Sequence, residues 1–198
     1  MHDTGAAVCV TQVTSDAEAA EAGRCLGEFL AWMRIRYAEQ IWIIDKYFDP
    51  VRWQKELAAP FEAYPPPAAA MLLAKVDGRT AGCVMLRDLG GGICEMKRMY
   101  VMPDFQGRGV GRVLGRALLD LAATRGYAAI RLDTGPLQPE AQGLYRSLGF
   151  REIDCYYDCP ADLQTLPSAA KTFVEHLRRS RQPPSPPVGG GVTQATAP

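Results

Sequence analysis

The chain has 198 residues, 47% of them hydrophobic, and its 22 basic side chains balance its 22 acidic ones. This length suffices for one domain with a sizeable core, and the balanced charge argues against a broad basic surface for nucleic acid. No apolar run reaches the roughly 18 residues that a membrane span needs, and the first residues lack the basic segment and apolar core of an export signal. We therefore expect a cytoplasmic protein that binds neither nucleic acid nor membrane.

The cysteines and histidines do not form a metal-binding pattern. Six cysteines are spread along the chain without a Cys-x-x-Cys pair, and the histidines His2 and His176 lie outside its central motifs. Structural zinc sites need clustered ligands of these types, so we expect no bound metal. Without an export signal, the thiols are expected to be reduced.

The first half of the chain predicts an edge strand, helices and a hairpin. Thr14-Ser15-Asp16 is a helix N-cap signal with Glu18 close behind it, and apolar residues then recur at helical spacing. Asp77-Gly78 is a strong hairpin-turn signal. Residues 1–6 are expected to be flexible, and the apolar run 41–44 fits no single element type. The expected elements are a strand at 7–13, a helix from 16 to 36 or 38, a short helix opened by Asp49-Pro50, and strands at 71–76 and 80–86.

Strands and helices alternate in the second half of the chain. Gly149 is placed to end a helix in the C-cap position, and segment 170–177 fits either a strand or a short helix. The tail 179–198 is rich in Pro and Gly and has too little apolar surface to fold, so we expect one domain over 7–178 and a flexible tail. The expected elements are a strand at 93–101, a helix over 113–121, a strand at 128–133, a helix at 141–148 and a strand at 150–157.

A glycine-rich loop at 106–111 joins the strand at 93–101 to an amphipathic helix. The start of a helix offers unpaired backbone N–H groups and the positive end of the helix dipole, which together attract phosphate. Gly109 and Gly111 have no side chain that would keep a phosphate away from the backbone. Arg108 and Arg112 add positive charge beside the loop. The loop is therefore a candidate phosphate-binding site.

Two well-known phosphate loops do not fit this segment. A Walker loop ends in Gly-Lys-Ser/Thr, whereas this chain has Gly111-Arg112-Val113. A dinucleotide fingerprint needs the spacing G-x-G-x-x-G, which glycines at 107, 109, 111 and 115 match poorly. A glycine-rich turn that only caps a core helix is a further alternative.

The chain resembles the GCN5-related N-acetyltransferase (GNAT) family at two motifs. The acetyl-CoA loop of that family has the pattern Gln/Arg-x-x-Gly-x-Gly/Ala, which Gln106, Gly109 and Gly111 match. The family's segment Ala-x-x-Leu-Tyr-x-x-x-Gly-Phe is matched at every specified position over 141–150. The resemblance is specific over residues 93–157 and general over 70–92.

The resemblance implies an α/β fold with a mixed, mostly antiparallel sheet of six or seven strands and helices on both faces. It also implies an acyltransferase that moves an acetyl group directly from acetyl-CoA, a co-substrate, to a primary amine. We expect a small-molecule or amino-acid-derived acceptor under the N-terminal helices. The alternatives are a protein or peptide acceptor, and a non-catalytic acyl-CoA-binding regulatory module. The sequence does not decide whether the protein forms a homodimer. The aromatic residues of that region, which we assign to the core rather than to a pocket, are Trp32, Tyr37, Trp42, Tyr47 and Trp53.

Glu95 is the candidate general base. It lies eleven positions before Gln106, the offset at which the histone-acetylating branch of the family carries its glutamate base. On a mostly apolar strand, a carboxylate is desolvated and becomes a stronger base. The alternatives are a structural ion pair of Glu95 with Lys97 or Arg98, and a water chain as the base.

Tyr145 is the candidate general acid. A phenol stays protonated at neutral pH and can donate a hydrogen bond to a thiolate, and the family places a tyrosine at this motif position for that role. The alternative is an aromatic residue that only fills the core.

The resemblance also implies which residues hold coenzyme A. The Met99 N–H would face the thioester oxygen, Met99 and Val101 would hold the pantetheine arm at a bulge where neighbouring strands splay, and the loop would hold the pyrophosphate. Many relatives carry Asn where this chain has Gln138, one methylene longer. The candidate cofactor-binding residues are Met99, Tyr100, Val101, Gln106, Gly107, Arg108, Gly109, Val110, Gly111, Arg112 and Gln138.

Overall fold

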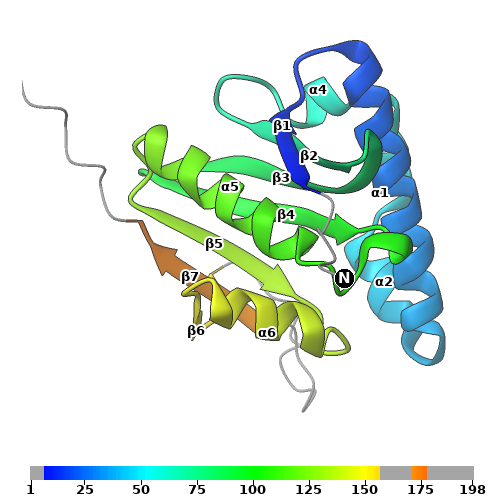
Figure 1. Ribbon diagram of the computed structural model, residues 1–198. Helices are drawn as coiled ribbons and strands as arrows, with labels where there is room; N and C mark the ends of the chain where they lie inside the picture. The colour runs from blue at the N-terminus through cyan, green and yellow to red at the C-terminus, as the bar shows by residue number, and fades with distance from the viewer. Residues whose placement is uncertain (1–6, 157–170, 178–198) are drawn as a thin grey trace, which may run out of the picture.

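A seven-stranded sheet runs through the computed structural model, which describes residues 7–156 and 171–177 (Figure 1). The strand order is β1-β2-β3-β4-β5-β7-β6, with β4 and β5 parallel and all other neighbours antiparallel. The expected flexible ends, 1–6 and 179–198, lie outside the described residues. The strands are β1 (Val8–Gln12), β2 (Ala70–Val76), β3 (Arg79–Gly90), β4 (Ile93–Val101), β5 (Ala129–Thr134), β6 (Arg151–Ile153) and β7 (Lys171–His176).

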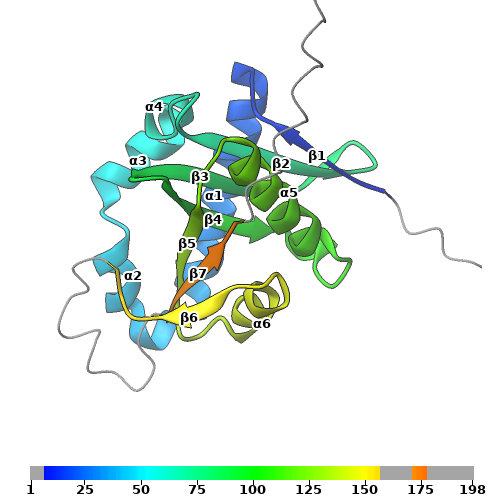
Figure 2. The same cartoon turned by 90° about the vertical axis from the view of Figure 1, so that its left-hand side faces the viewer.

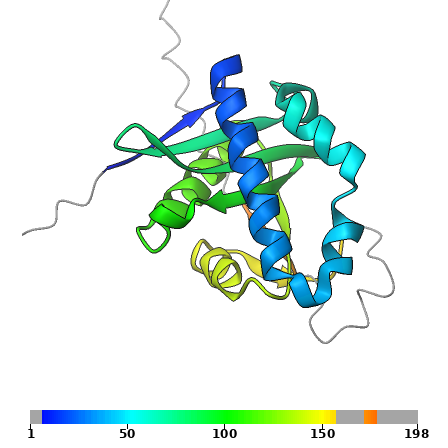
Figure 3. The same ribbon diagram turned by 90° about the vertical axis from the view of Figure 1, so that its right-hand side faces the viewer.

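Helices cover both faces of the sheet, as the family resemblance implies. One apolar core joins the sheet to α5 and α6, and a second core joins the other face to α1 and the short helices after it. Figure 3 shows α1 crossing in front of the strands. The expected mixed α/β fold is confirmed. The helices are α1 (Asp16–Arg36), α2 (Ile41–Tyr47), α3 (Pro50–Ala58), α4 (Pro60–Ala63), α5 (Val110–Thr124) and α6 (Pro139–Ser147), with 3-10 turns η1 (Ala38–Gln40) and η2 (Pro103–Phe105).

Local signals in the sequence account for the start of α1 and the end of α6. The Ser15 hydroxyl accepts a hydrogen bond from the Glu18 N–H, and the Glu18 carboxylate accepts one from the Ser15 N–H at 3.1 Å, so α1 begins with a capping box. Gly149 follows α6 with φ +103°, the backbone conformation that a C-cap glycine supplies. The run 41–44, which the sequence left unassigned, belongs to α2.

The C-terminal strands differ from the expectation in one respect. Segment 170–177 contains a strand, β7, which inserts between β5 and β6 (Figure 2). The expected strand at 150–157 was too long, because β6 spans only Arg151–Ile153. Ile153 already faces Thr172, the second residue of β7.

Strands β4 and β5 diverge after a short parallel ladder. Both strands are described from end to end, and their paired residues are Ile93↔Ala129, Cys94↔Ile130 and Glu95↔Arg131. Beyond these pairs, β4 continues to Val101 beside β3, and β5 continues beside β7. The edge of β4 that faces β5 therefore lacks ladder partners from residue 96 onward.

A bulge in β4 accompanies this divergence. The register shifts between the pairs Met85↔Lys97 and Cys83↔Tyr100, so β4 carries one residue more than β3 in this stretch. Arg98 has φ +53°, a left-handed conformation that costs energy in a non-glycine residue. The extra residue brings Lys97 and Arg98 to the same face of the sheet, where both line one cavity.

Gly82 of β3 sits against this bulge, and its substitution tests how tightly β3 and β4 pack. A Cβ atom at Gly82 would collide with the Tyr100 carbonyl oxygen and approach Val101 Cα to 3.2 Å. We expect Gly82→Ala to lower the free energy of unfolding by about 1–3 kcal/mol in urea titrations, the usual cost of overpacking. The matched control is Gly27→Ala in α1, where an added Cβ meets no atom within 4 Å and alanine should stabilise by about 0.5–1 kcal/mol. Unchanged stability of Gly82→Ala would show that β4 shifts without cost.

Candidate active site

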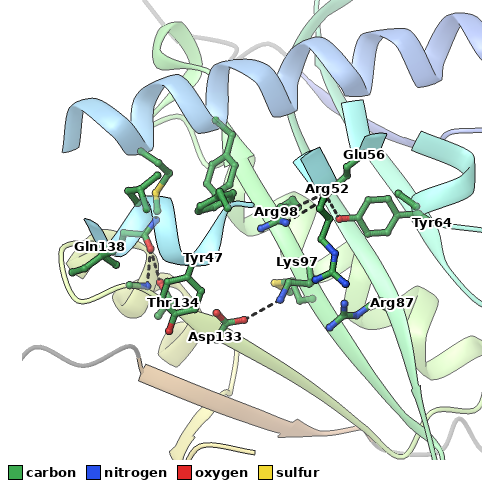
Figure 4. A pocket seen from close by; sticks show the side chains of 18 of the residues that line it. Tyr47, Arg52, Glu56, Tyr64, Arg87, Lys97, Arg98, Asp133, Thr134 and Gln138 are labelled. Atoms are coloured by element: carbon green, nitrogen blue, oxygen red, sulfur yellow. Dashed lines mark hydrogen bonds and ion pairs between the residues drawn. The ribbon is translucent and has the colours of Figure 1, made fainter. Parts of the chain in front are cut away.

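A cavity of about 590 Å³ lies between the helices α1 to α4 and the diverging ends of β4 and β5 (Figure 4). Side chains from α1 to α4 form one wall, and residues of β3, β4, β5 and the turn after β5 form the other. Its size lies within the range usual for small-molecule sites. Tyr37 and Tyr47 line it, whereas the Trp53 side chain is buried in the core and Trp42 is 42% exposed. The assignment to the core is confirmed for Tyr37 and Trp53 and is wrong for Trp42; Tyr37 and Tyr47 also contribute to the cavity wall.

Glu95 is buried beside the cavity, next to Arg87 and Lys97, and does not itself line it. Its carboxylate accepts hydrogen bonds from Arg87 Nη2 at 2.6 Å, the Tyr156 hydroxyl at 2.7 Å and Lys97 Nζ at 3.4 Å. Burial, followed by the charges of Glu95 and Asp133, raises the pKa of Tyr156, so this hydroxyl remains a donor. The ion pair with Lys97 that the sequence offered as an alternative is present. The pair with Arg98 is not.

Lys97 and Asp133 bridge the opening between the diverging strands. Lys97 lies on β4 and Asp133 on β5, both beyond the last β4–β5 pair, and Lys97 Nζ lies 3.3 Å from Asp133 Oδ1. Figure 4 shows this ion pair across the cavity floor. Asp133 is a carboxylate that lines the cavity directly, a position that the sequence indicated only by its closeness to the end of a strand.

Tyr145 lies in the core beside this opening. It is 7% exposed, and its ring packs against Phe150 and Phe173 at centroid distances of 5.9 and 6.2 Å. Burial, and then the negative charge of Asp133, raises the pKa of Tyr145 well above its ordinary value. Its side chain thus fills the core, as the alternative proposed, and also carries a hydroxyl that holds its proton.

Arg98 anchors α3 to the β4 bulge. Its guanidinium donates to both carboxylate oxygens of Glu56, at 2.9 and 3.1 Å, and lies over the rings of Phe48 and Trp53. The Tyr64 hydroxyl donates to the same carboxylate at 2.6 Å. Burial pushes the pKa of Glu56 upward, but the hydrogen bonds and charge of Arg98 outweigh it, so the pKa is lowered. The sequence did not indicate this cluster, because Glu56 and Arg98 are 42 positions apart.

The glycine loop follows β4 and leads into α5. Gly107 and Gly109 have φ +73° and +81°, and a Cβ atom at either would meet nothing within 4 Å, so space is open beside the backbone. Gly109 is the N-cap of α5. A Cβ at Gly111 would lie 3.1 Å from Leu144 Cδ2, so Gly111 also permits α6 to approach. The Gln106 side chain donates to the Val101 carbonyl at 3.0 Å and holds the loop against the end of β4.

Gln138 turns toward the cavity. Its Oε1 accepts from Gly135 N at 2.8 Å and Thr134 Oγ1 at 3.1 Å, and its Nε2 lies 3.4 Å from Met33 Sδ. The amide thus ties the turn after β5 to α1 and lines the cavity. A contact between Gln138 and coenzyme A stays a prediction.

The chain is similar in sequence to known N-acetyltransferases. An uncharacterized N-acetyltransferase of Schizosaccharomyces pombe is 40% identical over 107 residues, covering 53% of this chain and 66% of that protein. The N-acetylaspartate synthetase of Homo sapiens is 33% identical over 113 residues, covering 57% of this chain and 36% of that protein. The chain thus spans less than two thirds of the length of these relatives.

A solved structure shares the fold. An N-acetyltransferase from Thermoplasma acidophilum, in complex with coenzyme A, superposes with a TM-score of 0.58 at 16% identity, covering 86% of this chain and 99% of that one.

Among residues 7–156 and 171–177, no helix has the length and apolarity to cross a membrane, and no cluster of metal-ligand side chains occurs. The model of the Acetyltransferase (GNAT) family matches residues 31–150. The chain belongs to this family.

Proposed function

We propose that this enzyme transfers an acetyl group from acetyl-CoA directly to the primary amine of a small molecule or amino-acid derivative held in the cavity. The observation that carries the proposal is the opening between β4 and β5. On one side of it lies the unpaired edge of β4 with the glycine loop beyond, and on the other lies the cavity under α1 to α4. A donor and an acceptor bound at these places would meet at the opening, which is the main physical requirement for direct transfer.

Backbone groups are the proposed ligands of coenzyme A. The pantetheine arm would pair with the free edge of β4 at Met99 and Val101, as a peptide adds to a sheet edge, and the Met99 N–H would polarise the thioester carbonyl. The loop from Gln106 to Arg112 would hold the pyrophosphate at the start of α5. Support comes from the open space at Gly107 and Gly109 and from the coenzyme A complex of the structural relative.

The acceptor is proposed to be small because helices enclose the cavity on one side. A peptide acceptor would need an open groove that passes along the sheet. The relative named N-acetylaspartate synthetase supports an amino-acid acceptor. The test is acetyl-CoA turnover, followed by release of free thiol, across amino acids, amines, peptides and aminoglycosides. Turnover of peptides alone would contradict the proposal, and coenzyme A binding without any turnover would favour a non-catalytic module.

Proton removal from the amine is proposed to involve Glu95. Because its carboxylate is buried and already accepts from Arg87, Lys97 and Tyr156, the amine would reach it through a water molecule. Asp133, which lines the cavity, is the matched alternative. Tyr145 is proposed to donate a proton to the departing thiolate.

The pH dependence of turnover separates these two carboxylates. We expect Glu95→Gln to lower kcat at pH 7 by on the order of 100-fold or more, because the protonated amine has no lone pair. The deficit should shrink as the pH rises toward the pKa of the amine, about 10 for a lysine-like amine. The matched variant is Asp133→Asn, measured over the same pH range with saturating acceptor. If only the Asp133→Asn deficit closes at high pH, Asp133 is the base; a deficit of Glu95→Gln that is equal at every pH would indicate positioning instead.

A further inference from the structure

The charged side chains of the cavity are not evenly paired. Among the acidic residues, Glu56 is bound by Arg98 and Asp133 by Lys97, and Glu62 is exposed on α4. Within the described part of the chain, Arg52 has no ion-pair partner, and Arg87 uses only Nη2, toward Glu95. The basic residues that line the cavity are Arg52, Lys55, Arg87, Lys97 and Arg98.

Three of these cations point toward one end of the cavity. Figure 4 shows Arg52 reaching down from α3 toward Arg87, with the Lys97 ammonium beside them. Like charges in one place repel each other unless an anion lies between them. The carboxylate of Glu95 pairs with both Arg87 and Lys97, but no acidic side chain in the described ranges pairs with Arg52. Arg52 is therefore a cation of the cavity wall that can bind an added anion next to Arg87.

A carboxylate fits this place better than the phosphates of coenzyme A do. Guanidinium groups bind carboxylates with paired, charge-assisted hydrogen bonds. The glycine loop leads into α5, which packs on one face of the sheet, whereas Arg52 lies on α3, which belongs to the cluster of helices on the other face. The pyrophosphate at the loop is therefore separated from Arg52 by the sheet.

We propose that Arg52 and Arg87, together with Lys97, form a subsite for a carboxylate of the acceptor. This inference rests on the proposed function and narrows its substrate class to amines that also carry a carboxylate, such as free amino acids. Asp133 lies on the far side of Lys97, at the β4–β5 opening. One zwitterion can therefore direct its ammonium toward Asp133 and the opening while its carboxylate meets the guanidinium groups.

Matched pairs of acceptors test the proposal. Wild-type enzyme is assayed with L-phenylalanine, L-methionine and L-glutamate, and with the amines that lack their α-carboxylate. We expect kcat/KM to be about 10- to 100-fold higher for the amino acids, the range for hydrogen bonds to charged groups. Arg52→Gln should raise KM for the amino acids by a similar factor, change kcat little, and leave the kinetics of phenethylamine unchanged.

The control is Arg116→Gln, which removes another exposed arginine without an ion pair in the described residues, on α5 away from the cavity. It should leave both classes of acceptor unchanged. Equal preference of the wild type for amines and amino acids, or an equal effect of Arg52→Gln on both, would overturn the subsite while leaving the proposed acetyltransfer intact.

A binding measurement tests the carboxylate subsite independently of turnover. Succinate, at constant ionic strength, should raise the melting temperature of the wild type and of Arg116→Gln more than that of Arg52→Gln. If no amine is acetylated, the proposed function fails, but this difference still tests the subsite. Equal stabilisation of all three proteins by succinate would refute it.

Discussion

Replacing Gly109 by glutamate should abolish coenzyme A binding without unfolding the domain. Gly109 is the N-cap of α5 with φ +81°, and the space beside it is open. A glutamate there would put a carboxylate where the pyrophosphate is proposed to bind, and like charges brought together cost several kcal/mol. We expect the dissociation constant, measured by calorimetry with coenzyme A, to rise on the order of 100-fold or more.

The matched control for this substitution is Gly109→Gln. Glutamine has the same shape and the same strained backbone, which costs roughly 1–2 kcal/mol in a left-handed conformation, but it carries no charge. Both variants should lose similar stability in urea, and only glutamate should remove binding. Full affinity in a folded Gly109→Glu protein would show that the pyrophosphate lies elsewhere.

Replacing Tyr145 by phenylalanine should remove most turnover and keep both the fold and coenzyme A binding. The ring contacts with Phe150 and Phe173 survive the change, because only the hydroxyl is lost. Loss of a positioned proton donor should lower kcat by about 100-fold. Since burial and the Asp133 charge raise the pKa of Tyr145, the wild-type phenol should stay protonated, and its ionisation should not reduce kcat below about pH 10.

Tyr127→Phe is the control for the loss of a tyrosine hydroxyl. The Tyr127 hydroxyl donates to the Ala68 carbonyl at 3.1 Å, and the residue does not line the cavity. This variant should keep full turnover. If Tyr145→Phe also keeps it, Tyr145 has a packing role alone.

The features that the sequence predicted well depend on neighbouring residues. The capping box at Ser15, the hairpin at Asp77-Gly78 and the glycine loop are each set by a few consecutive side chains and backbone angles. The length of β6 depended instead on its pairing with β7, a segment that lies further along the chain. How many residues of an edge strand find a hydrogen-bonding partner is not specified by that strand's own sequence.

The partners of the candidate base illustrate the same limit. Arg87 lies directly opposite Glu95 across the β3–β4 hairpin, so the glycines at 90–92, taken as the turn, would have predicted this ion pair. Arg98 could not be placed in the same way, because the bulge moves it out of the regular alternation and toward Glu56. Strand periodicity predicts faces only as long as the register is unbroken.

The two cores on opposite faces of the sheet have a consequence for how such an enzyme can change. The helices α5 and α6, with the glycine loop, belong to one core, and the helices that enclose the cavity belong to the other. Substitutions in α2 and α3 can therefore reshape the proposed acceptor cavity without disturbing the packing behind the glycine loop. In this architecture the proposed donor site can stay constant while new acceptors are acquired, whereas β2, β3 and β4 contribute side chains to both cores, so substitutions in these strands affect both.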